Sequence, residues 1–287
     1  MRILVTGASG QLGSAVIETL LKKMPARQIT ALTRDEAKIA GAKAKGVQVA
    51  LGNYDDVGSL QTAMRGIDTV LLVSASDQGD RMQQHKNVVD AAKSAGVPGI
   101  AYTSRALRHR DALANPLMLE HFQTEDYIRA SGLAYTIFRN ALYMDVLPLF
   151  VGKQVFETGI FQPAGDGKVA FALRTELGEA IANVLSAETC ENKIYTFTGS
   201  AAYSFYDVAA VLSRLSGKEV KYTAVDVPAF EKRMKERGLP EMMVRKIVDF
   251  NTDIKNGQEA GITADLENTL GRRPATLADG LGVLFKL

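Results

Sequence analysis

The first half of the chain alternates short, continuous apolar runs with stretches in which apolar residues recur at helical spacing. Continuous runs of four to six residues between helices are typical of strands that are buried on both faces of a parallel sheet. The pattern therefore predicts an α/β fold with a doubly wound, right-handed parallel sheet. The predicted strands are residues 3–5, 29–32, 47–51, 69–73, 99–102 and 133–138, and the predicted helices are 14–24, 57–64, 81–95 and 116–130.

Beyond residue 140 this regular alternation fades. The second half contains a predicted turn at 165–167, a helix at 175–186, a strand at 193–198 that returns to the sheet, and several short helices with one strand at 220–225. We expect this half to cover the open end of the sheet. The chain divides into a main domain, 1–150 with 175–200 returning to it, and a smaller, mostly helical region, 151–174 and 201–287.

Three glycines follow the first strand at three-residue spacing. Gly7 suits the tight turn, Gly10 lets a ligand approach the backbone, and Gly13 lets the next helix pack on the strand. Free N–H groups at the start of that helix, together with its dipole, attract phosphate. A strand, a glycine turn and a helix in this order predict a Rossmann-type dinucleotide site. The candidate cofactor contacts here are Gly7, Ser9, Gly10, Gln11, Leu12 and Gly13.

The residue that follows the second strand indicates which cofactor is bound. An NAD-selective site usually has a carboxylate there, which accepts hydrogen bonds from the ribose hydroxyls. This chain has Arg34, whose guanidinium can pair with a 2′-phosphate, while Asp35 is better placed as the N-cap of the next helix. We therefore expect NADPH, with NADH bound more weakly.

Further cofactor contacts are expected where the later strands end, because ligands bind beyond the carboxyl ends of parallel strands. These candidates are Asn53, Ser74, Ala75, Ser76, Thr103 and Ser104. The basic loop 105–115 leaves from the same edge. Its role stays open between a substrate lid and an ordinary solvated loop.

Composition narrows the partners and the location. The net charge is +2, too balanced to favour nucleic acid or a membrane surface as a partner. A single cysteine, Cys190, and three histidines give no disulfide and no metal site, and they suit a reducing compartment. Because the chain starts directly in a strand and has no apolar run near 18 residues, we expect a soluble, cytoplasmic protein. The oligomeric state stays open, a homodimer included.

Several motifs together resemble the NmrA-like branch of the atypical short-chain dehydrogenases. They are Val-Thr-Gly-Ala-Ser-Gly-Gln-Leu-Gly at 5–13, Thr-Arg at 33–34, Ala-Tyr-Thr-Ser at 101–104, Ala-Tyr-Thr-Ile-Phe-Arg-Asn at 134–140 and Gly-Asp-Gly-Lys at 165–168. Within that branch the chain is most similar to bacterial members that reduce quinones or triphenylmethane dyes. The resemblance covers the whole chain and implies an NAD(P)H-dependent oxidoreductase.

One departure from the wider dehydrogenase pattern bears on the chemistry. A conventional member has a tyrosine with a lysine four residues later, and this pair donates a proton. None of the nine tyrosines here has that lysine. Isoflavone-reductase-like relatives carry a lysine before the sixth strand, and that place is His121 in this chain. His121 is therefore the candidate acid or the candidate contact to the nicotinamide or substrate, with a partly exposed histidine on an amphipathic helix as the alternative.

The missing donor fits an acceptor that takes hydride without needing an enzymatic acid. A cationic triphenylmethane dye becomes its neutral leuco form on gaining hydride, and a quinone product can take its proton from water. We expect catalysis by orientation, with a planar, electron-poor aromatic substrate held over the nicotinamide. The alternative is a non-catalytic, NmrA-like redox sensor that binds NAD(P). The candidate substrate contacts are His121, Asn140, Tyr143, Met144 and Phe150.

Overall fold

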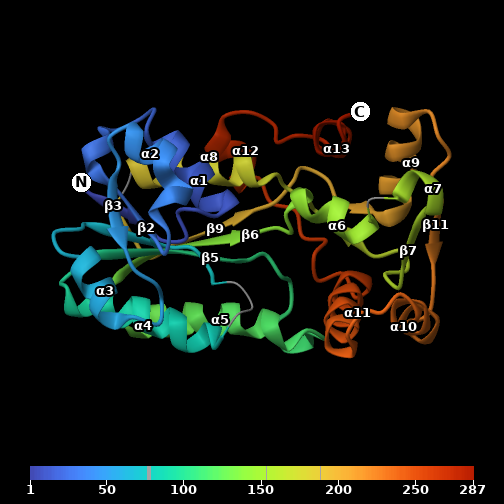
Figure 1. The fold of residues 1–287 in the computed structure, drawn as a ribbon, viewed down its shortest axis with the longest axis horizontal. Coiled ribbons are helices and arrows are strands. Elements are labelled where there is room, and N and C mark those ends of the chain that lie inside the picture. The colour runs from blue at the N-terminus through green and yellow to red at the C-terminus, as the bar shows by residue number, and fades with distance from the viewer. Residues whose placement is uncertain (76–78, 153, 188) are drawn as a thin grey trace.

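A seven-stranded sheet forms the centre of the computed structural model, which describes residues 1–75, 79–152, 154–187 and 189–287 (Figure 1). All neighbouring strands in it are parallel. The strand order reverses between β1 and β4, as in a doubly wound Rossmann sheet, so the predicted fold class is confirmed. From edge to edge the strands are β3 (Gln48–Leu51), β2 (Ile29–Thr33), β1 (Ile3–Val5), β4 (Thr69–Leu72), β5 (Gly99–Arg105), β6 (Ala134–Asn140) and β9 (Lys193–Phe197).

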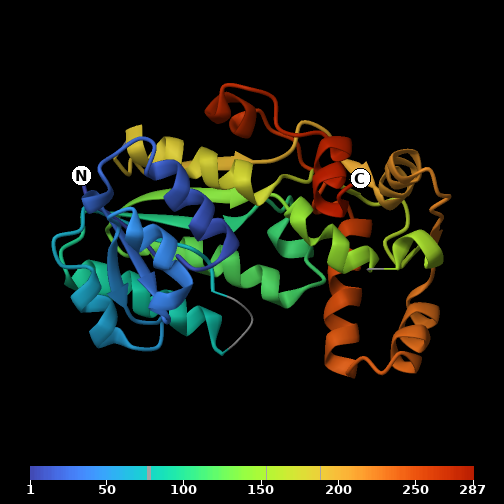
Figure 2. The same ribbon diagram turned by 45° about the horizontal axis from the view of Figure 1, so that its top comes forward.

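Helices cover both faces of this sheet (Figures 1 and 2). Successive residues of β1 point to opposite faces, so Ile3 and Val5 join one apolar cluster and Leu4 joins the other. This explains why the strand needs an unbroken apolar run. One face carries α1 (Gln11–Leu20), α2 (Ala40–Ala44), α8 (Arg174–Ala187) and α12 (Asp265–Leu270), and the other carries α3 (Val57–Ala63), α4 (Arg81–Ser94) and α5 (Pro116–Ala130).

The first helix lies earlier in the chain than the sequence pattern predicts. Instead of spanning 14–24, α1 begins at Gln11, with Gly10 as an extended N-cap residue at φ −81° and ψ 163°. The glycine turn therefore feeds directly into the helix and Gly13 is helical. The helix ends at Leu20 because residues 21–24 form a turn before Pro25, which disfavours helical backbone in the residue that precedes it.

Two strands on the β4 side of the switch point, β5 and β6, run further toward the carboxyl edge than their apolar runs do. β5 continues past Tyr102 to Arg105, and β6 continues to Asn140, which pairs with Arg105 in the register. These added residues are polar, yet Thr103, Ser104 and Arg105 are all buried. Hydrophobicity alone could not reveal strand residues whose side chains are buried through hydrogen bonds and ion pairs.

The second region lies beyond the carboxyl ends of the strands (Figure 1). Its turn at 165–167 forms as predicted, with the Gly167 N–H donating to the carbonyl of Ala164 at 3.0 Å. The strands that flank the turn do not pair with each other: β7 pairs in parallel with β11, and β8 pairs antiparallel with β10. The elements are β7 (Ile160–Gln162), β8 (Lys168–Val169), β10 (Tyr203–Ser204), β11 (Tyr222–Ala224), α6 (Leu147–Val151), α7 (Val155–Thr158), α9 (Phe205–Ser216), α10 (Val227–Glu236), α11 (Glu241–Lys255) and α13 (Leu277–Phe285).

Short 3-10 turns connect the larger elements within the described ranges. Two of them, η1 (Ala26–Gln28) and η2 (Glu36–Ile39), flank β2, while η3 (Arg110–Ala112) lies in the loop after β5 and η4 (Met144–Val146) leads into α6. Across the described residues, no helix combines the length and apolar character needed to cross a bilayer.

Candidate active site

A cavity with a volume of about 600 Å³ lies at the carboxyl edge of the sheet. We call it the main cleft. It is bounded by the glycine turn after β1 and by the ends of β2, β3 and β4. Seven of the residues selected from the sequence line it: Gly7, Ser9, Gly10, Arg34, Asn53, Ser74 and Ala75.

The glycine turn leaves the first helical amides open to the main cleft. Gly7 has φ +57°, and its carbonyl accepts the N–H of Gly10 at 2.9 Å. A Cβ on Gly13 would lie 2.4 Å from the Gly7 carbonyl oxygen, so only glycine fits where α1 crosses the turn. In the part of the chain described, no side chain caps α1 and its first turn carries no acidic residue. The start of α1 therefore remains free to bind an anion.

Two residues selected as cofactor contacts take different positions on α1. The side chain of Leu12 is buried in the apolar core, so only its backbone can contribute to a ligand site. Gln11 is exposed, and its Oε1 accepts a hydrogen bond from Arg174. A sequence motif gives positions but not the direction of each side chain.

Two cations and an amide lie at the outer end of the main cleft. Arg34 follows β2, and Asp35 caps η2 by accepting the Ala37 N–H at 3.0 Å, as the sequence predicts. Lys38, one turn later, also lines the cleft and was not selected from the sequence. The Oδ1 atom of Asn53 already accepts two backbone N–H groups from its own loop, so only its Nδ2 group remains for a ligand.

Tyr54 also lines the main cleft and was not selected from the sequence. Its hydroxyl lies 2.6 Å from Thr6 Oγ1 and 2.7 Å from the carbonyl oxygen of Val73. It therefore ties the loop after β3 to the ends of β1 and β4. Burial raises the pKa of Tyr54, so the phenol stays protonated. The position of its ring was not predictable from the sequence, because its two partners follow two other strands, β1 and β4.

The backbone after β4 is held from beneath by side chains. The Ser74 N–H donates to Thr103 Oγ1 at 2.9 Å, and the Ala75 N–H donates to His85 Nε2 at 2.9 Å. Burial, with a contribution from Arg81, lowers the pKa of His85 to about 3, so this imidazole is neutral. Ser76, which was also selected, lies outside the described residues.

Thr103 and Ser104 do not line the main cleft. Thr103 is buried below Ser74, where it acts as a hydrogen-bond acceptor. Ser104 Oγ donates to Glu125 Oε1 at 2.6 Å, and Glu125 also pairs with Arg139. Both residues therefore support the site from below, and the strand that carries them is longer than its apolar part suggested.

His121 lies on α5 and is 6% exposed. Its Nδ1 atom is 2.9 Å from the hydroxyl of Tyr102. Burial, reinforced by the charges of Arg81 and Arg105, lowers the pKa of His121 well below its usual value. The imidazole is therefore neutral near pH 7 and holds no readily donated proton.

The remaining candidate substrate contacts differ in their surroundings. The side chain of Asn140 is fully buried, and neither its oxygen nor its nitrogen has a hydrogen-bond partner among the described residues. Tyr143 is half-buried under the guanidinium of Arg174, whose Cζ lies 4.5 Å from the ring centroid. Phe150 is half-buried in the second region, with its ring 5.4 Å from that of Phe250.

Met144 was selected as a wall of the substrate pocket, and this interpretation is wrong. Met144 is fully buried in the core of the second region. Its sulfur lies against α13, where a Cβ on Gly280 would come within 2.0 Å of it. Methionines are flexible fillers of irregular core gaps, and this one fills the gap that Gly280 leaves.

The loop after β5 is fastened to the second region. Arg105 forms a buried ion pair with Glu259, so this residue does not fit the solvated loop that was one of the two interpretations of the sequence. At the far end of the loop, Asp253 accepts the N–H groups of Ala114 at 2.6 Å and Asn115 at 3.1 Å. These partners lie about 140–150 residues away in the sequence and left no local signal.

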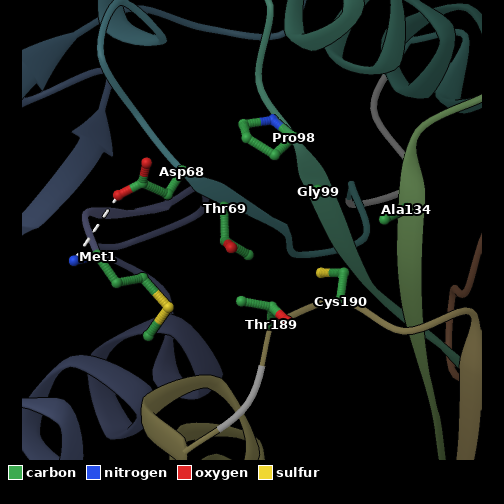
Figure 3. A pocket seen from close by; sticks show the side chains of 8 residues that line it. All are labelled: Met1, Asp68, Thr69, Pro98, Gly99, Ala134, Thr189 and Cys190. Atoms are coloured by element: carbon green, nitrogen blue, oxygen red, sulfur yellow. Dashed lines mark ion pairs between the residues drawn. The ribbon is translucent and has the colours of Figure 1, made fainter.

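A smaller cavity of about 340 Å³ lies at the opposite, amino edge of the sheet (Figure 3). Its lining includes Asp68, whose carboxylate is 3.8 Å from the amino group of Met1, and the thiol of Cys190. Burial raises the pKa of the Cys190 thiol, which therefore stays protonated and weakly nucleophilic. This cavity is separated from the glycine turn by the length of the strands.

Comparison with known proteins gives relatives that match almost the full length of the chain. Quinone oxidoreductase 2 of Escherichia coli is 38% identical over 286 residues, 99% of each chain. A structure of that NADPH-dependent enzyme complexed with NADPH has a TM-score of 0.93, covering 99% of this chain and 100% of the other.

Two further relatives are named as reductases of other compounds. The structure of Citrobacter sp. triphenylmethane reductase complexed with NADP(H) is 35% identical, with a TM-score of 0.90 over 99% of this chain and 100% of that chain. The NAD(P)H azoreductase of Xenophilus azovorans is 29% identical over 96% of both chains. A sequence model described as the NmrA-like family matches residues 1–278. The chain therefore belongs to the NmrA-like family.

Proposed function

We propose that this protein is an NADPH-dependent reductase that transfers hydride to a planar, conjugated, electron-poor acceptor, either a quinone or a cationic triphenylmethane dye. The observation that carries the proposal is the main cleft, in which an uncapped helix start and two cations, Arg34 and Lys38, lie at the two ends of one cavity. The relatives described above are named for such acceptors and for NADPH.

The residues present fit the cofactor. A diphosphate suits the glycine turn, where a Cβ on Gly10 would lie 3.2 Å from the Gly7 carbonyl oxygen and narrow the approach to the backbone. A 2′-phosphate suits Arg34 with Lys38, because an arginine directly follows β2 at the position where an NAD-selective site usually has a carboxylate. The orphaned amide of Asn140 fits a polar group at the nicotinamide end, since a buried amide without partners costs about 1–3 kcal/mol.

The chain's own residues bind and orient the reactants. NADPH, when bound, supplies the hydride. The hydrogen bonds from Ser74 and Ala75 to Thr103 and His85 keep the floor beside the nicotinamide in one conformation. Tyr143 and Phe150 are the aromatic groups that we assign to the substrate, with Asn140 as its polar contact. His121 stays neutral, so the protein positions an acceptor that needs no enzymatic acid.

The proposal also assigns a role to each part of the chain. Residues 1–150, with 175–200, bind the cofactor, and 151–174 with 201–287 cover the substrate. The contacts of Asp253 and Glu259 with the loop after β5 support this division, because they join the two parts at the edge where the substrate would lie. A homodimer and a cytoplasmic location stay predictions.

The test is multiple-turnover oxidation of NADPH by the purified protein with a neutral quinone and with a cationic triphenylmethane dye. We expect steady consumption of NADPH, formation of hydroquinone or leuco dye, and transfer of deuterium from labelled NADPH to the central carbon of the dye. The variant Gly10→Val is the matched control and is expected to lose turnover. Tight binding of NADPH without turnover of either acceptor class would favour the redox-sensor function instead.

A further inference from the structure

Arg174 is the first residue of α8, and the packing of α8 against α1 fixes its position. Both helices start at the carboxyl edge of the sheet and run toward the amino edge. They touch closely at Gly178, where a Cβ would lie 2.6 Å from Cβ of Ala15. Gln11 and Arg174 lie one turn before Ala15 and Gly178, so the two helix starts meet at these two side chains.

The guanidinium of Arg174 is held by contacts that leave its charge unneutralised. Its NH1 group donates to Gln11 Oε1 at 2.5 Å, and its plane lies over the ring of Tyr143. Its backbone N–H donates to Asp145 Oδ2 at 2.9 Å, but its side chain forms no ion pair within the described residues. A guanidinium has five N–H donors, so several remain for another acceptor.

This charge lies beside the place assigned to the diphosphate. Gln11 directly follows Gly10, which lines the main cleft at the start of α1. Tyr143 follows β6, on the side of the switch point away from Arg34 and Asn53. Arg174 therefore approaches the glycine turn from the nicotinamide side and not from the adenine side.

We propose that Arg174 binds the nicotinamide-side phosphate of the cofactor diphosphate, and this rests on the proposed function above. Arginine suits the role because its planar fork pairs with two phosphate oxygens at once. Gln11 and Tyr143 hold the fork in place, so little side-chain freedom is lost on binding. The same guanidinium would connect the cofactor to the ring of Tyr143, which we assign to the substrate wall.

The test uses two fragments of NADPH that differ by the nicotinamide-side phosphate and the ribose attached to it. 2′-Phospho-ADP-ribose carries both phosphates of the diphosphate, whereas 2′-phosphoadenosine 5′-phosphate carries only the adenine-side phosphate. Calorimetry would measure both affinities for the wild type and for Arg174→Gln. We expect Arg174→Gln to bind the first fragment about tenfold more weakly and the second fragment unchanged.

Two further variants separate this role from a structural one. Arg174→Lys keeps the charge but not the fork, so its affinity for 2′-phospho-ADP-ribose is expected to lie between those of wild type and Arg174→Gln. Arg27→Gln removes one positive charge from the exposed turn before β2, at the other edge of the sheet, and is expected to change neither affinity. Thermal melts would show that all variants are folded.

The results distinguish failure of the Arg174 assignment from failure of the proposed function. Equal affinities of Arg174→Gln and wild type for 2′-phospho-ADP-ribose would overturn the assignment of Arg174 and leave the proposed function intact. Equal losses for both fragments would also overturn it, because the arginine would then act only by tying α8 to α1. A wild type that binds neither fragment would overturn both proposals.

Discussion

The Nε2 atom of His85 accepts a hydrogen bond from the backbone N–H of Ala75 at 2.9 Å. A neutral imidazole that accepts at Nε2 carries its proton on Nδ1, and this nitrogen lies 2.8 Å from Thr124 Oγ1. The threonine hydroxyl in turn donates to the carbonyl of Glu120 at 2.8 Å. A chain of hydrogen bonds from α5 through α4 thus fixes the backbone at one wall of the main cleft.

Replacing His85 should therefore weaken cofactor binding without touching the cofactor. In His85→Phe the Ala75 N–H loses its acceptor, and we expect the affinity for NADPH to fall about tenfold, because an unpaired buried N–H costs about 1–3 kcal/mol. His85→Gln is the control, since its side-chain oxygen can accept the same bond. Calorimetry with NADPH would compare them, and a similar affinity in both variants would contradict this role for His85.

The buried histidines also give the protein a defined acid sensitivity. The pKa of His85 falls from 6.5 to about 3 on folding, and that of His121 falls well below 6.5. Below pH 6.5 the unfolded chain takes up a proton at each site and the folded chain does not. The stability that these neutral groups contribute is therefore complete above 6.5 and is lost as pH falls toward the folded pKa.

We expect the free energy of unfolding to decrease as pH falls from about 6.5 to 5, with a contribution from His85 that approaches about 1.4 kcal/mol per pH unit and a contribution of the same sign from His121. Urea titrations across this range would measure the slope. His85→Gln should lower the slope by the contribution of one proton. A His85→Gln slope equal to that of wild type would show that the unfolded and folded pKa values of His85 do not differ.

The two cations at the outer end of the main cleft should discriminate between NADPH and NADH. Arg34→Ala removes a charge-assisted contact with the 2′-phosphate, which typically costs about 1.5–3 kcal/mol, so NADPH affinity should fall more than tenfold while NADH affinity barely changes. Lys38→Ala should have the same sign and a smaller size. Lys22→Ala, in the turn after α1, is the charge-matched control. Equal weakening of both cofactors by Arg34→Ala would refute the assignment.

The order of strands and helices in the first half could be predicted because each buried strand has a continuous apolar run, and helical apolar spacing separates these runs. The start of α1 could not, because glycines are poor helix formers by propensity and yet Gly13 is helical where it packs on the Gly7 carbonyl. Tertiary contact overrides local preference at this place, as is expected near a ligand site.

Some residues of the candidate site could likewise be predicted from the sequence and others could not. Gly10, Arg34 and Ser74 follow strands directly, and strand ends in a parallel sheet share one edge, so their common cleft was predictable. His85 and Glu259 were not, because their roles depend on partners from distant elements. Met144 shows the opposite error, since an apolar residue near a site is more often part of the core.

Gly10 and Gly13 should respond differently to substitution, although both belong to one motif. A Cβ on Gly13 would lie 2.4 Å from backbone oxygen, so Gly13→Ala should destabilise the fold by a few kcal/mol. At Gly10 the nearest atom to a Cβ is 3.2 Å away, so Gly10→Ala should fold and mainly weaken NADPH binding. Thermal melts and calorimetry on both variants would measure the two effects, and an equal loss of melting temperature would contradict the distinction.

The last prediction concerns the proton. His121 is the remaining candidate acid near the nicotinamide end, but it is buried, neutral and bonded through Nδ1 to Tyr102. A dye cation that accepts hydride forms a neutral product without a proton. We therefore expect His121→Ala to change kcat for a cationic dye only modestly, whereas loss of a general acid typically costs about 10²–10⁴-fold.

His121→Asn makes this test sharper, because its amide can replace Nδ1 as the partner of Tyr102 and so preserves the packing. If His121 acts only through that contact, His121→Asn should match the wild type with the dye and with a quinone alike, and the small loss in His121→Ala should appear with both acceptors. If His121 delivers a proton, both variants should lose quinone turnover and keep dye turnover, because only the hydroquinone gains protons. Deuterated NADPH would show in each case that hydride transfer is being measured. A thousand-fold loss on the dye in His121→Asn, with NADPH affinity unchanged, would mean that the histidine supplies chemistry that a cationic acceptor does not require.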